Sequence, residues 1–371
     1  MAYIAVGSLL GRVLGDTSYG QLAVFNEVIR LVLDAYVEPV NVDRAMAGAD
    51  LGLTDALDGD SSYLDADEFK AYQRRAKDPD ADVGVVLTRR FSFLMVVSAR
   101  SGSPAERAGL KPGDILKTID GRHTRPMGVP TGDRLLRGAP GSVVKLKVLR
   151  AGTDPLDFSV TRERLGGVAP QRRVLGDGVG YLKVAEFPAK TGDEVRDEVE
   201  ALKRAGARRL VLDLRGATYG LPAEGVKVAE IFLKGGVVTK LSGRRVTEQV
   251  FTADPSRSAW DLPMAVLVDT GTSGPGEIVA AALLDAGRSP VIGEHTFGRA
   301  GVQKAVPLPE GGLVLTVAKY FSPKGNAIHG KGVEPSVPVE AADQADDGSA
   351  PRDPILDKAL EVLKAEVKKA A

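Results

Sequence analysis

Hydrophobic residues recur at helical spacing near the start of the chain. Between residues 22 and 33 they fall every three or four positions, which predicts an amphipathic helix that ends near Pro39. A second helix is predicted over residues 43–57. The polar stretch 58–65 that follows is rich in Asp and Ser and predicts a turn whose side chains cap the next helix. We therefore expect a helical region over residues 16–80.

The pattern changes to short alternating runs after residue 81. Turns separate the apolar runs, and two short helical stretches lie between them. This arrangement is typical of a small β-rich barrel with two helices, which we place at residues 81–165. The predicted strands are 83–87, 93–99, 115–119, 143–149 and 158–161, and the predicted helices are 104–108 and 131–137.

Longer strands and helices alternate from residue 166 to residue 340. Such alternation predicts a layered α/β core with crossover connections. The predicted helices are 191–204, 222–233 and 276–286, and the predicted strands are 179–184, 209–214, 237–241, 264–268, 291–292, 302–306 and 313–320. Residues 341–371 complete the chain as an acidic linker followed by an amphipathic helix over 353–369. The chain is thus predicted to be an α+β or α/β multidomain protein.

The first fifteen residues allow two interpretations. Residues 1–10 are mostly apolar, but the first cation is Arg12, which follows the apolar run. A signal peptide needs positive charge before that run, and a spanning helix needs about 20 apolar residues. Residues 1–15 are therefore expected to be either the remnant of an export segment or the start of a helix.

Composition excludes several classes of function. The 371 residues suggest two or three domains, and Lys+Arg and Asp+Glu both number 49, so no net charge favours a nucleic-acid partner. Cysteine is absent and the three histidines are isolated, which argues against a zinc site. The spacing of Asp58, Asp60 and Asp65 does not fit a calcium loop. We expect no metal and no cofactor.

One segment of the β-rich region carries a specific pattern of turn glycines. The run from Gly102 to Leu116, with Ile119-Asp-Gly121 after it, resembles a PDZ domain. The resemblance implies that an extended peptide tail adds a strand and places its carboxylate among backbone N–H groups. The carboxylate loop aligns with residues 82–86, so Val83, Gly84, Val85 and Val86 are the expected peptide-binding residues. Asp82 would repel a carboxylate if it pointed inward, so a PDZ domain that serves only as a spacer is the alternative.

Several segments of the α/β core resemble the C-terminal processing (tail-specific) serine peptidases. The segments, in order along the chain, are Leu210–Gly236, Val266–Leu283, Val291–Gln303 and Gly330–Pro335, together with Tyr36–Pro39 and Ser61–Asp65 nearer the start. The similarity covers about residues 20–340. It implies a PDZ domain joined to a layered α/β core of the C-terminal processing peptidase type. It also implies a protein that is periplasmic or otherwise exported, with membrane association through a missing N-terminal segment as a further expectation.

The two positions that should carry the chemistry differ from the family pattern. The family has a serine nucleophile three residues before Glu277, and Gly274 stands there. Its catalytic lysine follows a Phe-Gly pair, and Arg299 stands there. The supporting glutamine is retained as Gln303. In the loop that resembles part of the oxyanion hole, Gly220 could still offer a backbone N–H.

These two changes remove the chemistry that the resemblance would imply. A serine hydroxyl must pass its proton to a neutral base as it attacks a peptide carbonyl, and arginine remains protonated in proteins. Glycine has no side chain to attack with. We therefore predict a pseudoprotease that binds peptide C-termini or unfolded segments as a scaffold or regulator, either as a homo-oligomer or in complex with an active relative.

Three alternatives remain open from the sequence. Ser273 could act as a displaced nucleophile and His295 as a base, although a helix cap and a polar loop residue are the simpler roles for them. Arg299 and Lys304 could together form a cationic pocket for peptide carboxylates. The fold could also serve only as a building block of an oligomer.

Overall fold

The structure is a computed structural model that describes residues 16–74, 81–341 and 352–370. The chain forms two compact units, residues 1–52 and residues 53–371. The predicted N-terminal remnant and most of the acidic linker lie outside the described residues. Among the helices of the described residues, none combines the length and apolar character needed to cross a membrane.

The first unit contains the amphipathic helix that the sequence predicts. Helix α2 spans Asp16–Ala35, and helix α3, Val42–Asp55, begins in this unit and ends in the next. The apolar stripe of α2 is partly open to solvent, because Leu22 is 52% exposed and Phe25 is 40% exposed. Within this unit the helix therefore has an apolar face that its own residues do not cover.

The polar segment after α3 contains a strand that the sequence analysis missed. Strand β1 (Ser62–Leu64) pairs antiparallel with β18 (Gly311–Phe321), so residues 58–65 are not only a turn. The predicted cap is confirmed, because Asp65 Oδ1 accepts hydrogen bonds from the backbone N–H groups of Asp67 (3.0 Å) and Glu68 (2.8 Å) at the start of α4 (Ala66–Arg74).

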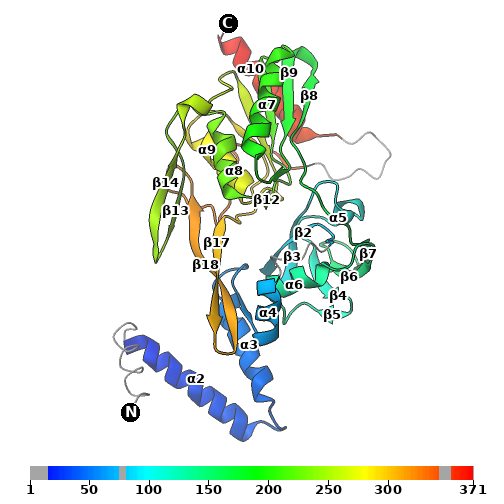
Figure 1. Cartoon of the computed structure of the whole chain (residues 1–371), viewed down its shortest axis with the longest axis vertical. Helices are drawn as coiled ribbons and strands as arrows, with labels where there is room; N and C mark the ends of the chain where they lie inside the picture. The colour runs from blue at the N-terminus through cyan, green and yellow to red at the C-terminus, as the bar shows by residue number, and fades with distance from the viewer. Residues whose placement is uncertain (1–15, 75–80, 342–351, 371) are drawn as a thin grey trace. The chain divides into compact units, whose positions relative to one another are not determined.

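The β-rich region forms one sheet with two short helices, as predicted (Figure 1). Its strand order is β2-β3-β4-β6-β7, with β5 paired to β4. Strand β2 begins two residues later than predicted, because Gly84 adopts a φ of +82° that interrupts the extended backbone. The elements are β2 (Val85–Arg90), β3 (Phe93–Ala99), α5 (Pro104–Arg107), β4 (Ile115–Ile119), β5 (Arg122–His123), α6 (Val129–Leu136), β6 (Val143–Leu149) and β7 (Leu156–Thr161).

A second six-stranded sheet forms the α/β core. Its order is β19-β16-β15-β11-β9-β8, and every pair is parallel except β8 with β9 at one edge. Strand β15 has all five residues buried, which explains its continuous apolar sequence. The strands are β8 (Gln171–Leu175), β9 (Val179–Lys183), β11 (Arg209–Asp213), β15 (Met264–Val268), β16 (Val291–Gly293) and β19 (Val337–Pro338).

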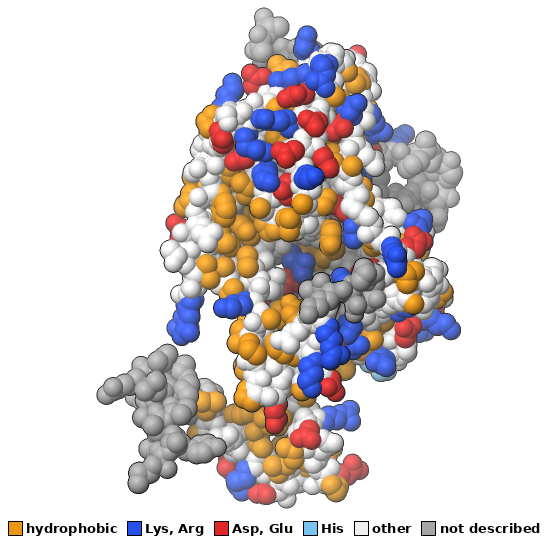
Figure 2. Space-filling view, viewed as in Figure 1, with side chains coloured by type: hydrophobic (Ala, Val, Ile, Leu, Met, Phe, Trp, Pro, Cys, Tyr) orange, Lys and Arg blue, Asp and Glu red, His pale blue; other side chains and the backbone are white. Residues whose placement is uncertain are grey.

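Helices cover both faces of this sheet (Figure 1). Alternate residues of a strand point to opposite faces. Leu210 and Leu212 of β11 therefore pack with α7 (Thr191–Arg204), α8 (Pro222–Glu230) and α9 (Pro275–Asp285), whereas Val211 packs with α10 (Pro354–Ala370). The outer surface over α7 carries acidic and basic side chains side by side, in keeping with the balanced charge of the chain (Figure 2).

A third sheet and a short parallel pair complete the core. Strand β18 pairs with β1, β13 and β17, and β13 pairs with β14. Strand β14 was not predicted, because most of its residues are exposed and carry no apolar period. The strands are β13 (Val237–Gly243), β14 (Val246–Thr252) and β17 (Gly301–Leu308), and the short pair is β10 (Glu186–Phe187) with β12 (Tyr219–Gly220).

Candidate functional site

The candidate site lies where β15 turns into helix α9. Gly274 is the N-cap residue of α9 and has φ +56° and ψ −116°, a conformation that favours glycine. Pro275 follows at the first helical position, where its missing N–H is no loss. A Cβ at Gly276 would lie 2.7 Å from the carbonyl oxygen of Ala217, so a glycine is needed there for close packing.

One buried carboxylate ties this turn to the loop that carries Arg299. Glu277 Oε2 accepts hydrogen bonds from the backbone N–H groups of Gly274 and Arg299, both at 2.9 Å. Its Oε1 accepts from Thr296 Oγ1 and from the N–H of Gly298, both at 2.6 Å. Burial raises the pKa of Glu277 to about 7, against these hydrogen bonds, which lower it.

The structure brings Gly274 and Arg299, the two positions that differ from the family pattern, close together. In the chain, 24 residues lie between them. A Cβ at Gly274 would lie 3.4 Å from the carbonyl oxygen of Arg299 and 3.7 Å from that of Thr218. These are ordinary contacts, so the backbone leaves room for a small side chain at position 274. Glycine supplies none.

The Arg299 side chain forms an ion pair with Asp60. Its Nε lies 2.8 Å from Asp60 Oδ1 and 3.0 Å from Oδ2, and the Asp60 side chain is only 4% exposed. Burial works to lower the pKa of Arg299, but Asp60, with smaller contributions from Asp133 and Glu277, outweighs it and the pKa is raised. The guanidinium therefore remains a cation. The Gln303 side chain, which the family pattern retains, donates from Nε2 to Thr316 Oγ1 (3.4 Å).

The loop after β11 contributes the third side of the site. Thr218 Oγ1 donates to the carbonyl oxygen of Gly271 (2.5 Å) and accepts from Ser98 Oγ of β3 (2.7 Å). Gly220 has φ +128°, and a Cβ there would lie 2.2 Å from the carbonyl oxygen of Phe187. The backbone of Gly220 is thus held against Phe187, in a conformation and a space that only glycine fits.

An ion pair and a cation–π contact link the β-rich region to the short strand pair that contains Gly220. Arg100, just after β3, binds both carboxylate oxygens of Glu186 at 2.7 and 2.9 Å. Its guanidinium also lies over the Tyr219 ring, 4.0 Å from the centroid. The loop that carries Gly220 is therefore in direct contact with the β-rich module.

Ser273 does not have the capping role expected from the sequence. The helix begins at Pro275 rather than at residue 276, so Gly274 takes the N-cap position and Ser273 precedes it. The Ser273 side chain is buried, and its Oγ has no hydrogen-bond partner among the described residues. The interpretation of Ser273 as a cap is therefore wrong.

His295 is positioned as a loop residue. Its Nδ1 lies 2.8 Å from the carbonyl oxygen of Thr296, and its Nε2 lies 3.5 Å from Glu334 Oε2. The ring is 48% exposed. Neither contact directs the imidazole toward Gly274 or Ser273.

A cavity of about 810 Å³ lies beside Arg299. It is bordered by the loop before β1, by strand β2 and by the loop that precedes β17. Its lining includes Asp60, Arg299, His295, His329 and Lys331. Lys304 is not among the lining residues, so the cationic pocket that the sequence suggested, formed by Arg299 with Lys304, is not assembled in this structure.

The expected peptide loop of the PDZ-like module is largely buried. Val83 and Val85 belong to the core of the module, at 0% and 8% exposure. The Gly84 N–H donates to Asp82 Oδ1 (3.1 Å), so this carboxylate already takes one of the loop's donors. Only Val86 of the four expected residues has a partly exposed side chain.

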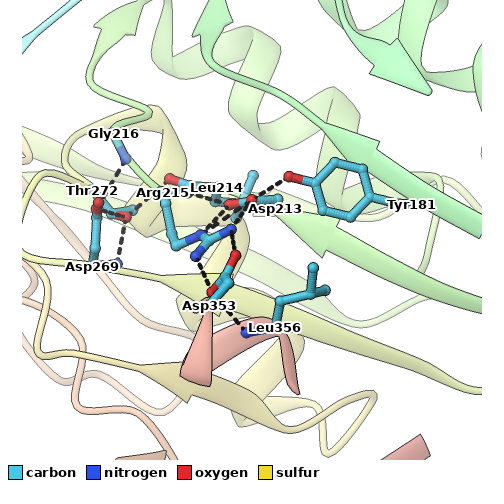
Figure 3. A network of polar contacts seen from close by, with 9 residues as sticks. All are labelled: Tyr181, Asp213, Leu214, Arg215, Gly216, Asp269, Thr272, Asp353 and Leu356. Atoms are coloured by element: carbon cyan, nitrogen blue, oxygen red, sulfur yellow. Dashed lines mark hydrogen bonds and ion pairs between the residues drawn. The ribbon is translucent and has the colours of Figure 1, made fainter. Parts of the chain in front are cut away.

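A second polar cluster fixes the C-terminal helix to the core sheet (Figure 3). Arg215 lies between two carboxylates and donates to Asp213 Oδ2 (2.6 Å) and to Asp353 at 2.8 and 3.0 Å. Asp213 also accepts from the Tyr181 hydroxyl (2.5 Å), and Asp353 Oδ1 caps α10 at the Leu356 N–H (3.0 Å). Partial burial works to raise the pKa of Asp353, but the hydrogen bonds and charge of Arg215 outweigh it, so that this pKa is lowered.

Two roles in the site were missed from the sequence. Asp60 was considered only as a calcium ligand, yet it is the ion-pair partner of Arg299. Glu277 served only to mark a position, yet it bonds both degenerate positions. The signal for Asp60 was its place directly before the family-like segment Ser61-Ser-Tyr. Its partner, Arg299, lies 239 residues away in the chain.

Comparisons with known proteins agree with this fold. Peptidase family S41 matches residues 178–339, and a PDZ domain matches residues 95–150. The chain is 31% identical over 341 residues to the carboxy-terminal processing protease CtpA of Bacillus subtilis, which covers 91% of this chain and 73% of the relative. It is 32% identical over 332 residues to a carboxy-terminal-processing protease of Bartonella bacilliformis, covering 88% of this chain and 76% of the relative.

A solved structure supports the same assignment. The photosystem II D1 C-terminal processing protease superposes with a TM-score of 0.71 at 26% identity, covering 85% of this chain and 86% of that one. The chain combines a PDZ domain with an α/β peptidase core. It belongs to peptidase family S41, the C-terminal processing peptidases.

Proposed function

We propose that this chain is a non-catalytic member of its family, a pseudoprotease that holds peptide or protein tails without cutting them. The observation that carries the proposal is the pairing at the degenerate site. Gly274 offers no nucleophile, and Arg299 forms an ion pair with the buried Asp60 carboxylate. A guanidinium of this kind cannot take a proton from an attacking hydroxyl.

The PDZ domain supports the binding part of the proposal. PDZ domains bind peptide C-termini by strand addition, and β2 lies at the edge of its sheet. The bond from the Gly84 N–H to Asp82 must open for a terminal carboxylate to use that donor. We therefore expect weak binding of tails, in a scaffold or regulator that joins copies of itself or an active relative.

The test is a cleavage assay beside a binding assay. The full chain is incubated with an unfolded substrate such as reduced casein, and C-terminal peptides are titrated by fluorescence anisotropy. The proposal predicts no cleavage and measurable peptide binding. Matched peptides with an amidated C-terminus should bind more weakly, because they lack the carboxylate that a PDZ loop recognises.

A second candidate is an active peptidase with a displaced nucleophile. It is favoured by one observation, the buried Ser273 hydroxyl without a hydrogen-bond partner among the described residues. The neighbouring groups argue against it, because Arg299 cannot serve as a base and the His295 contacts point elsewhere. Turnover that disappears in Ser273→Ala would establish this candidate. Self-association without binding of either peptide would instead support a purely structural role.

We also propose a location outside the cytoplasm, in the periplasm or another exported compartment. The support is the family membership alone. Fractionation of cells that produce the native chain tests it, and recovery in the cytoplasmic fraction would contradict it.

A further inference from the structure

Asp60 is held in place by contacts that do not involve Arg299. Asp58 Oδ1 accepts hydrogen bonds from the backbone N–H groups of Asp60 (2.9 Å) and Ser61 (2.7 Å). The carbonyl oxygen of Gly59 accepts from the Arg89 N–H of β2 (2.8 Å), and a Cβ at Gly59 would lie 2.4 Å from the Arg89 oxygen. These contacts hold the backbone on both sides of Asp60 without any contribution from Arg299.

The Asp60 carboxylate has a small set of partners. Its oxygens lie 2.8 and 3.0 Å from Arg299 Nε, and Thr88 Oγ1 donates to Oδ1 at 3.4 Å. The side chain is 4% exposed, so water offers it little solvation. A buried carboxylate in this setting strongly favours a cation at position 299.

We propose that Asp60 is a third determinant of inactivity, beside Gly274 and Arg299. Its carboxylate would hold a lysine placed at position 299 as the protonated ammonium. In the family's reaction the neutral lysine amine takes the proton of the serine hydroxyl while the serine oxygen bonds to the peptide carbonyl carbon. An ammonium has no lone pair for that proton, so exchange of two residues would leave most of the base protonated near neutral pH.

Two further acidic side chains near position 299 add to this effect, and a neighbouring arginine is already paired. Asp133 and Glu277 act on Arg299 in the same direction as Asp60. Arg89 is already bound to Asp55 at 2.6 Å, so its charge is compensated. The remaining charged or titratable side chains that line the neighbouring cavity are Asp58, Arg90, His295, His329 and Lys331.

The size of the effect follows from the contact. An opposite charge within hydrogen-bond distance typically moves a pKa by about 1–3 units. Each unit lowers the fraction of neutral lysine tenfold at a pH below that pKa. Removal of the Asp60 charge should therefore increase the active fraction at least about tenfold.

The experiment compares the rates at which full-length variants with a restored serine and lysine cleave unfolded casein, between about pH 6 and pH 10. Gly274→Ser/Arg299→Lys is the double variant, and addition of Asp60→Asn gives the triple variant. We expect the triple variant to cleave at least about tenfold faster near pH 8, with the midpoint of its pH profile at least one unit lower. Asp60→Asn/Gly274→Ser, which keeps Arg299, is the matched control and should stay inactive. Equal rates and equal midpoints for the double and triple variants would overturn the inference.

A second readout does not require turnover. The lysine introduced by Arg299→Lys is titrated by NMR of its Cε, with and without Asp60→Asn. Its pKa should fall by at least about one unit when the Asp60 charge is removed, and an unchanged pKa would overturn the inference. Asp60→Ser replaces Asp60→Asn if a thermal melt shows that the latter does not fold. The inference rests on the proposed function, but wild-type cleavage would refute only that function and leave this titration unaffected.

Discussion

Two arginines in the core each pair with a buried carboxylate, and the two guanidinium groups differ in how many of their nitrogens donate hydrogen bonds. Arg215 lies between Asp213 and Asp353, and three of its nitrogens donate hydrogen bonds to them (Figure 3). In the described part of the chain, the Arg299 guanidinium donates only through Nε, to Asp60. The first arginine joins helix α10 to the sheet, whereas the second lies beside a cavity.

The difference indicates what each cluster was shaped to do. The two carboxylates around Arg215 also accept hydrogen bonds from other groups, Asp213 from the Tyr181 hydroxyl and Asp353 from the Leu356 N–H. The cluster therefore joins α10 to the sheet through several hydrogen bonds. Arg299 is 27% exposed and borders a cavity, so its site still resembles a binding cleft. Both clusters hold a permanently charged guanidinium, and neither has an arginine that can act as a base.

The largest expected effect comes from breaking the Arg215 cluster. Arg215→Ala leaves Asp213, whose side chain is 0% exposed, without its cation. An uncompensated buried charge typically costs about 3–5 kcal/mol, so the free energy of unfolding should fall by that amount in a denaturant melt. Arg215→Lys, which keeps the charge but not the fork of donors, should lose less. Equal stability of Arg215→Ala and wild type would show that the cluster does not hold α10.

Glu277 should be the next most sensitive position. Glu277→Gln keeps one acceptor oxygen but turns an NH2 group toward N–H donors such as those of Gly274 and Arg299. Loss of two buried hydrogen bonds should cost about 2–4 kcal/mol. The measurement is again the free energy of unfolding, with Glu248→Gln on the exposed part of β14 as the matched control. A cost below about 0.5 kcal/mol would contradict the role of Glu277 in joining the start of α9 to the loop that carries Arg299.

The pH dependence of stability tests the same residue. The folded pKa of Glu277, about 7, exceeds the ordinary value of 4.5, so the folded chain retains this proton longer than the unfolded chain does. Its contribution is full below about pH 4.5 and is lost as pH rises through about 7, for a total of about 3 kcal/mol. Unfolding melts across this window should show the decline in wild type and a flatter profile in Glu277→Gln. Identical profiles would show that Glu277 is ionised throughout.

Removal of the Arg299 charge should have a smaller effect than removal of Arg215. Arg299→Met leaves Asp60 buried without its cation, but the pair is partly exposed, so we expect a loss of about 1–3 kcal/mol. Asp60→Asn added to Arg299→Met should recover much of it, because no unpaired charge remains. A double-mutant cycle measures this coupling, and a coupling energy near zero would contradict the ion pair.

Gly274 should show the smallest effect. Gly274→Ala fits the available space but places a side chain at φ +56°, which should cost about 1–2 kcal/mol. Gly166→Ala, at a position with open space and no positive φ, is the matched control and should be neutral or slightly stabilising. A neutral Gly274→Ala would indicate that the turn relaxes.

The sequence was most informative where burial forces a pattern. Strand β15 and helix α9 were predicted closely because a buried strand and its helix are continuously apolar. The exposed strand β14 and the short strand β1 carry no such pattern, and both were missed. The positions of Gly274 and Arg299 followed from family resemblance.

The partners of those positions could not be predicted in the same way. The ion pair between Arg299 and Asp60 joins residues that are 239 positions apart. The sequence around each residue gives no indication of its partner. The cap at Ser273 was misplaced because the helix begins one residue earlier than its apolar pattern indicates. Long-range pairing and exact helix starts depend on tertiary packing, which periodicity does not contain.

Cleavage of an unfolded substrate by the wild-type chain tests the central claim most directly. The full-length protein is incubated with reduced casein and the products are followed by mass spectrometry. The account predicts no turnover above background, because no hydroxyl stands at Gly274 and Arg299 retains its proton. Turnover at about 1 s⁻¹ or faster would contradict it, and loss of that turnover in Ser273→Ala would identify the nucleophile.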